Sequence, residues 1–143
     1  MYRTLEYLRG IAPDECRRLR GLGVQHSNQL LHFLTLDIDR RKVSRKTGIP
    51  APRLLQLARQ CALLEISGID RHLDVVHRLG IDGLKALKAE DAGALHDRLR
   101  SALGPVAAPQ LTTVEYWISQ ARSIDILEED VPAASEDSPS LVR

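Results

Sequence analysis

Two stretches of the chain carry the same pattern, and this repeat decides the fold. Residues 8–24 read LRGIAPDECRRLRGLGV, and residues 66–81 read ISGIDRHLDVVHRLGI. The matched glycines are Gly10 with Gly68 and Gly23 with Gly80. The pattern describes a helix, a tight turn, a second helix, and a glycine that turns the chain into the next helix. We therefore expect two divergent copies of one helical hairpin.

Neither hairpin is large enough to bury its apolar face alone. Between them, Pro50 and Pro52 lead into a segment that is apolar around most of its circumference as far as Ile66. Such a helix belongs in a core. The sequence therefore predicts an all-α fold in which two divergent hairpins pack around a central long helix over residues 50–66.

Caps and breakers place the remaining helices. We expect helices to start after Thr4, at Pro13, at Ser27 or Asn28, at Asp37 or Asp39, after Asp82, at Glu90 or Asp91, and after Thr112 or Thr113. Gly48 is placed to end the helix that precedes it. No segment is convincing as a strand.

The domain organisation follows from the repeat and from composition. We expect one domain over residues 1–127, with repeat one at about 8–35 and repeat two at about 66–89. Residues 128–143 are acidic and rich in Ser, Pro and Ala, which is typical of a disordered tail.

Charge is uneven although the whole chain carries a net charge of only +1. Residues 1–60 hold 12 Lys and Arg against 5 Asp and Glu, residues 61–127 hold 7 against 9, and residues 128–143 hold 1 against 5. A basic first half beside an acidic end indicates a surface that faces a polyanion, or a tail that screens one. The simpler interpretation is a solvated surface with uneven charge.

Several classes of protein are disfavoured by composition. Aromatic residues make up 3% of the chain, too few for a platform that stacks bases. No secretory signal and no apolar stretch long enough to cross a membrane is present, so we expect a cytoplasmic protein. Cys16 and Cys61 lack the spacing of a zinc site or a disulfide framework.

Three motifs occur in a fixed order: the first hairpin, the sequence KTGIP at residues 46–50 before the long helix, and the closing VEYWISQA at residues 114–121. Together they resemble the helix-hairpin-helix superfamily and, more narrowly, the uncharacterised bacterial family called domain of unknown function 4332. The resemblance covers roughly residues 8–126. It implies a bundle of helices like that of a SAM domain, built from two helix-hairpin-helix repeats.

The resemblance also implies a ligand, because hairpins of this superfamily usually hold a DNA phosphate on backbone amides without reading sequence. On that basis phosphate contact is expected at Gly10, Ile11 and Ala12. The usual hairpin reads glycine, apolar residue, glycine, and Ala12 departs from this pattern. In the second copy the glycine is deleted and Asp70 places a carboxylate where a phosphate would sit, so that hairpin is expected to be structural.

A basic run follows the first hairpin. The residues that we expect to contact nucleic acid there are Arg40, Arg41, Lys42, Arg45 and Lys46, with Arg53 extending the surface. Like charges four residues apart on a helix cost a few tenths of a kcal/mol, which a nearby anion would offset. The alternative is a solvated helix whose cations pair with Asp37, Asp39 or the acidic tail.

Other chemistry-bearing residues read as structural. The five histidines show no metal-ligand spacing, and the two cysteines read as small core residues. The family resemblance implies that Trp117 anchors the last helix in the core. No phosphate loop, dinucleotide fingerprint or catalytic motif is present, so neither an enzyme nor a cofactor is expected.

These observations favour a non-catalytic binding module. Its expected partner is duplex DNA or another polyanion, held by its backbone through residues 10–13 and 40–46. Five or six engaged cations would give a log–log salt slope of roughly −4 to −5. The alternative is a protein-interaction or scaffold domain in which the hairpins survive only as architecture. In either case the acidic tail could compete for the basic run.

Overall fold

The computed structural model describes residues 2–129. Within that range the chain forms eight α-helices and two short 3-10 helices and no strand, so the predicted all-α class is confirmed. In chain order the elements are η1 (Leu5–Tyr7), α1 (Pro13–Arg20), α2 (Ser27–Leu34), α3 (Asp37–Thr47), α4 (Ala51–Leu63), η2 (Asp70–His72), α5 (Leu73–Arg78), α6 (Leu84–Lys88), α7 (Ala92–Leu103) and α8 (Leu111–Ser123). The disordered tail predicted for residues 128–143 lies outside the described residues, except for Glu128 and Glu129.

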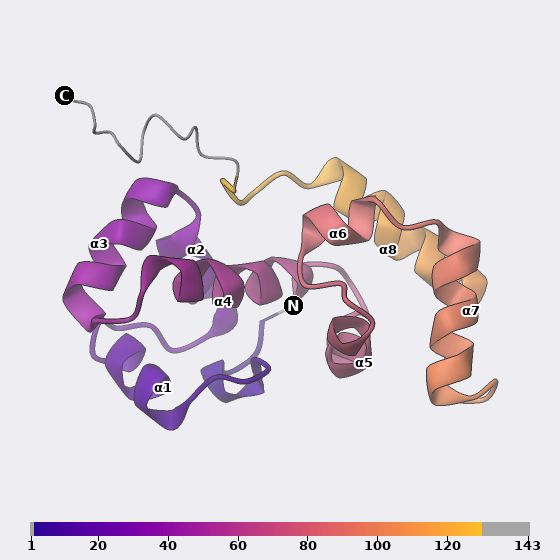
Figure 1. Cartoon of the computed structure of the whole chain (residues 1–143), viewed down its shortest axis with the longest axis horizontal. Helices are drawn as coiled ribbons and strands as arrows, with labels where there is room; N and C mark the ends of the chain where they lie inside the picture. Colours follow the sequence, from indigo (N-terminus) through magenta and orange to yellow (C-terminus); the bar gives the residue numbers. More distant parts are fainter. Residues whose placement is uncertain (1, 130–143) are drawn as a thin grey trace.

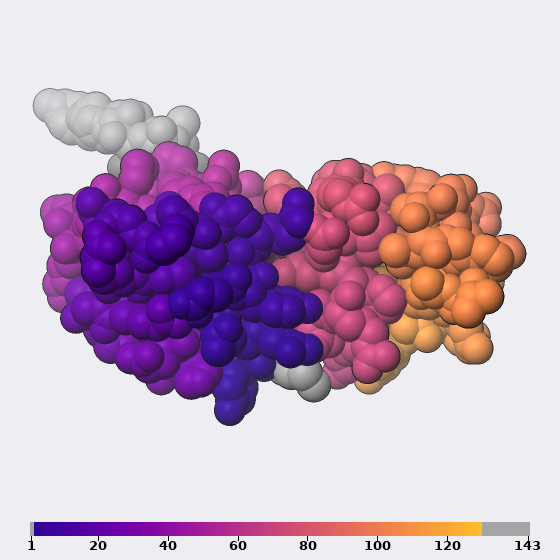
Figure 2. Space-filling view, turned by 90° about the horizontal axis from the view of Figure 1, so that it is seen from below, coloured from indigo at the N-terminus to yellow at the C-terminus, as the bar shows by residue number. Residues whose placement is uncertain are grey.

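The helix α4 is the centre of the fold. Figure 1 shows α1, α2 and α3 around one end of α4, and α5 to α8 beyond its other end. Helices α2, α3 and α6 all pack against α4. We call residues 2–66 the first half and residues 67–129 the second half; Figure 2 shows them side by side along the long axis of the molecule.

Capping residues and helix breakers in the sequence predicted most helix ends correctly. Pro13 occupies the first position of α1, where its missing N–H costs nothing. Asp91 caps α7 by accepting a hydrogen bond from the Ala94 amide at 3.0 Å. Gly48 ends α3 in the left-handed conformation, with φ at 80°. Each of these ends depends only on neighbouring residues.

Three expected helix ends are wrong by a few residues. Helix α8 begins at Leu111, before the threonines that were expected to cap it. Gly83, and not Asp82, precedes α6. Helix α4 ends at Leu63, and the apolar run continues to Ile66 in turns that stay buried. Apolar periodicity therefore predicted burial correctly here but overestimated the length of the helix.

The matched glycines share their local geometry. Gly23 and Gly80 have φ values of 91° and 92°. After each, an amide reaches back five residues: Val24 donates to the Leu19 carbonyl, and Ile81 donates to the Val76 carbonyl, both at 3.2 Å. Gly10 and Gly68 also have positive φ, at 73° and 84°. The sequence repeat thus corresponds to repeated turns of the backbone.

The second half closes around α8. Trp117 is fully buried there and its ring lies 5.6 Å from that of His72, which confirms the prediction that Trp117 is a core residue. Beyond α8 the chain returns to the first half, where the Glu128 amide donates to the Thr35 carbonyl at 2.8 Å. None of the helices between residues 2 and 129 is long and apolar enough to span a membrane.

Candidate nucleic-acid interface

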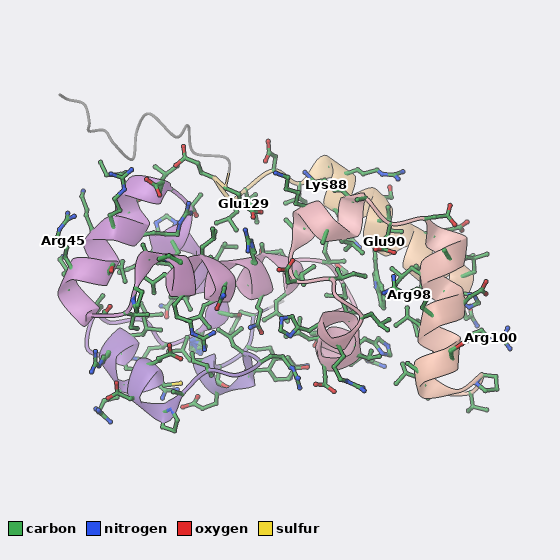
Figure 3. The ribbon with its side chains drawn as sticks, viewed as in Figure 1. Arg45, Lys88, Glu90, Arg98, Arg100 and Glu129 are labelled. Atoms are coloured by element: carbon green, nitrogen blue, oxygen red, sulfur yellow. The ribbon has the colours of Figure 1, made fainter. Side chains whose placement is uncertain are left out.

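One face of α3 presents cations to solvent. Lys42, Arg45 and Lys46 are exposed, and their side chains make no ion pair with any described residue. At 3.6 residues per turn these three positions fall within an arc of about 100°. Figure 3 shows Arg45 on the outer side of α3, pointing away from the rest of the molecule. The structure therefore brings these three predicted residues together.

Arg41 lies on the same side of α3 but is already paired. Its guanidinium donates to the Asp37 carboxylate one turn earlier, with the Nε–Oδ2 distance at 2.8 Å. The side chain remains about half exposed. Arg41 can therefore contribute to an anion site only in competition with Asp37.

Arg40 is a correction to the sequence-based prediction, because it is 2% exposed and unavailable to a ligand. Its guanidinium donates to the Leu34 carbonyl at 2.8 Å and to the Glu128 carbonyl at 2.5 Å. Burial lowers the pKa of Arg40. A signal was present: Val43 is the apolar residue of the run, and Arg40 precedes it by three and so shares its inward face.

The first hairpin also departs from the expected phosphate site. The Ala12 amide donates to the Glu15 carboxylate at 2.9 Å, and the Ile11 amide donates weakly to the Leu8 carbonyl at 3.4 Å. The carbonyl of Gly10 accepts from Arg53 at 2.8 Å. The Ala12 and Ile11 amides are therefore engaged within the hairpin, and phosphate contact at Gly10, Ile11 and Ala12 stays a prediction.

Arg53 likewise serves the fold. Its Nε and Nη2 donate to the two Glu15 carboxylate oxygens at 2.9 and 3.0 Å. This contact joins α4 to the start of α1. The Arg53 guanidinium holds the pKa of Glu15 below its usual value. The spacing of Glu15 from Ala12 is that of a capping box, which is the sequence signal for this arrangement.

In the second hairpin, Asp70 contacts the N-terminal segment of the chain. Asp70 is buried and forms an ion pair with Arg3, which lowers the pKa of the Asp70 carboxyl. The Tyr7 hydroxyl donates to the Asp70 carbonyl, so the contact ties the N-terminal segment to the second half.

The acidic end of the described chain contacts the basic helix at its N-terminus. The Glu128 carboxylate accepts from the Asp37 amide at 2.7 Å, which caps α3. The Glu129 carboxylate accepts from Arg59 on α4 at 2.7 Å. Nothing local in the sequence predicts these contacts. They leave the C-terminal cations of α3 uncovered by any described residue.

An exposed apolar patch adjoins the basic face. It comprises Phe33, Leu36 and Ile38 at the junction of α2 and α3, exposed by 38%, 46% and 58%. Ile38 precedes Lys42 by four residues on the same face of α3. The patch could contact an apolar group of a partner beside the cations.

Two kinds of chemistry-bearing side chain can be placed in the described part of the chain, namely potential metal ligands and thiols. No group of three His, Cys, Asp or Glu side chains there is arranged to hold a metal ion. Cys16 and Cys61 are free thiols in the core, and burial raises the pKa of each.

Comparison with known proteins gives one match. The model of a family described as "Domain of unknown function (DUF4332)" matches residues 9–124. No curated protein and no solved structure matches the chain.

Proposed function

The chain belongs to the DUF4332 family, and we propose that it is a non-catalytic module that binds the backbone of nucleic acid, chiefly duplex DNA, without reading sequence. The observation that carries this proposal is the exposed face of α3. Lys42, Arg45 and Lys46 lie together there without a partner among the described residues. Lysine and arginine gain affinity for phosphates by releasing counterions, which requires no base contact.

The proposal includes the role of the two hairpins. We infer that they are helix-hairpin-helix units of a bacterial cytoplasmic protein, and that they serve as architecture that displays α3. The matched turns at Gly23 and Gly80 support a common hairpin. The Glu15 carboxylate on the Ala12 amide argues against a phosphate at the first hairpin.

The number of available cations sets the expected salt dependence. Three phosphate contacts would give a log–log slope of about −3, shallower than the roughly −4 to −5 that five or six cations would give. Affinity would then fall roughly 40-fold between 50 and 200 mM salt. Binding of this kind is weak and steeply dependent on salt.

The test is a titration of labelled duplex DNA at two salt concentrations with the variant Lys42→Ala/Arg45→Ala/Lys46→Ala. We expect a large loss of affinity and a slope close to zero. The matched control is Arg71→Ala/Arg100→Ala/Arg122→Ala, which removes the same charge from exposed side chains in the second half. Equal losses in both variants would show that net charge alone governs binding and would overturn the proposed site.

A second candidate function, protein interaction, rests on the apolar patch of Phe33, Leu36 and Ile38. A partner with an acidic and apolar surface would match the patch and the cations beside it. If wild-type protein fails to bind duplex DNA at low salt, this function replaces the first.

A further inference from the structure

A small polar cavity lies where the two halves meet. Its volume is about 200 Å³. The side chains that line it come from the turn before α1, from α4, from α5 and from the turn before α6: Arg9, Arg53, Gln56, Arg59, His77 and Asp82. We call it the arginine cavity. Its wall includes Arg9, which precedes Gly10 in the first hairpin, and Asp82, which follows Gly80 by two residues in the second.

Cationic side chains outnumber acidic ones on the wall of the cavity. Three guanidiniums and one carboxylate line it, a formal net charge of +2 with His77 counted as neutral. The carboxylate is that of Asp82. It forms only a long ion pair with Arg59, with 3.9 Å between the Asp82 Oδ2 and the Arg59 Nη1. An arginine guanidinium is a planar fork that matches the oxygens of a phosphoryl group.

Each arginine is held by a carboxylate that does not line the cavity. Arg9 pairs with Asp74, and Arg59 donates its Nε to Glu129 at 2.7 Å. Arg53 is held by Glu15, as described above. These contacts fix the orientation of each guanidinium. Arg53 also donates to the Gly10 carbonyl at 2.8 Å and to the Gln56 Oε1 at 3.2 Å, so the N–H groups that stay available belong mainly to Arg9 and Arg59. A binding site whose groups are held in place before the ligand arrives loses less entropy on binding.

The packing around the cavity is also specific. Gln60 is buried and exchanges two hydrogen bonds with the Arg9 backbone, at 2.7 and 3.0 Å, which fixes the turn that carries Arg9. Gly83 lies against the stem of Arg59, where a Cβ would come within 3.1 Å of the Arg59 Cβ. An alanine at position 83 would displace that stem.

We propose that the arginine cavity binds a small phosphate-bearing anion. Its volume is below the roughly 300 Å³ at which drug-sized pockets begin, so it would accept a phosphoryl group with few further atoms. The convergent guanidiniums would bind the phosphoryl oxygens, and Gln56 at the rim would donate an amide hydrogen bond. This inference does not depend on nucleic-acid binding by α3.

Two isosteric substitutions at exposed residues test the charge requirement with the full chain. Gln56→Glu adds a carboxylate to the wall, and Asp82→Asn removes one. We expect Gln56→Glu to weaken the binding of inorganic phosphate about tenfold and Asp82→Asn to strengthen it several-fold. The matched controls are Gln110→Glu and Asp97→Asn at exposed positions outside the cavity, which should leave affinity unchanged.

The measurement is a titration with inorganic phosphate at constant ionic strength, followed by amide chemical shifts and by calorimetry. Saturable shifts centred on Arg9, Gly10 and Gly83, with opposite effects of the two substitutions, are the expected result. Absence of saturation, equal affinities in all variants, or shifts centred on α3 would overturn the proposal. The variant Lys42→Ala/Arg45→Ala/Lys46→Ala separates the two functions, since it should lose DNA binding and keep phosphate binding. The phosphate-binding proposal would also be overturned if wild-type protein did not bind free phosphate while the Gln56→Glu variant lost DNA binding.

Discussion

The Glu15 carboxylate joins the first helix to the central one by accepting two hydrogen bonds from Arg53, at 2.9 and 3.0 Å. It accepts a third from the Ala12 amide at 2.9 Å. One side chain therefore caps α1 and pairs α1 with α4. The same contact satisfies the amide that a hairpin of the phosphate-binding kind would leave open.

Replacing Glu15 should therefore destabilise the fold in a pH-dependent way. Glu15→Ala leaves Arg53 and the Ala12 amide without their acceptor, so we expect the free energy of unfolding to fall by about 2 kcal/mol at pH 7. Folding lowers the pKa of Glu15. The contribution of the Glu15 carboxylate to the free energy of unfolding is therefore complete above the pKa of Glu15 in the unfolded chain, and it disappears as the pH falls through the pKa of Glu15 in the folded protein.

Urea unfolding at pH 7 and near pH 2 measures this effect. The wild type and Glu15→Ala should differ clearly at pH 7 and much less in acid. Glu115→Ala, at an exposed position on α8, is the control and should be neutral at both pH values. A difference that persists unchanged in acid would contradict the ionic origin of the effect.

Arg40 and Lys42 lie two residues apart on α3 but should behave differently when replaced. Arg40→Met leaves the Leu34 and Glu128 carbonyls without a donor, so we expect a loss of about 2–3 kcal/mol in unfolding free energy. Lys42→Met should leave stability unchanged and reduce DNA affinity. Chemical denaturation and DNA titration, run on both variants, measure the two effects. A stable Arg40→Met protein that binds DNA as weakly as Lys42→Met would show that Arg40 is a contact after all.

The sequence correctly predicted those features of the fold that depend on residues close together in the chain. The starts of α1 and α7 follow from Pro13 and Asp91, and the burial of α4 follows from apolar patterning. The burial of Trp117 was implied by the family resemblance. Arg40 was misassigned because a charge run was taken as one surface, although helix geometry turns Arg40 inward beside Val43.

The arginine cavity could not be predicted in this way. Its arginines lie at positions 9, 53 and 59, and they meet His77 only after the two halves pack. The contacts of Glu128 and Glu129 with the first half are equally long-range. Sequence separation of this size leaves no local pattern to read, so tertiary packing alone assembles these groups.

The cap supplied by Glu128 should stabilise the start of α3. Glu128→Ala removes the acceptor of the Asp37 amide, and we expect a loss of about 1 kcal/mol. Hydrogen exchange should increase in the first turn of α3 and remain unchanged near Gly48. Asp125→Ala, also exposed in the returning segment, is the control. Uniform acceleration along α3 would mean that Glu128 supports the whole fold rather than this helix end.

The two thiols should be unreactive until the protein unfolds. Cys16 is 3% exposed and Cys61 is fully buried, and burial raises the pKa of each thiol, so little thiolate is present and a reagent has little access. At pH 8 we expect both cysteines to react with an aromatic disulfide reagent rapidly in denaturant and only at the opening rate in buffer. Rapid labelling of native Cys61 would contradict the packing of α4.

The equivalence of the two hairpins can be tested at their matched turns. Gly23 and Gly80 have nearly the same positive φ, and a Cβ at either would meet nothing within 4 Å. Alanine therefore encounters only backbone strain, and we expect Gly23→Ala and Gly80→Ala each to cost about 1–2 kcal/mol. Denaturation midpoints of the two variants should shift alike, and the double variant should show the sum if the two turns do not interact. Clearly unequal costs would mean that similar turns have been placed in different surroundings, and that the repeat in the sequence does not extend to the energetics of the hairpins.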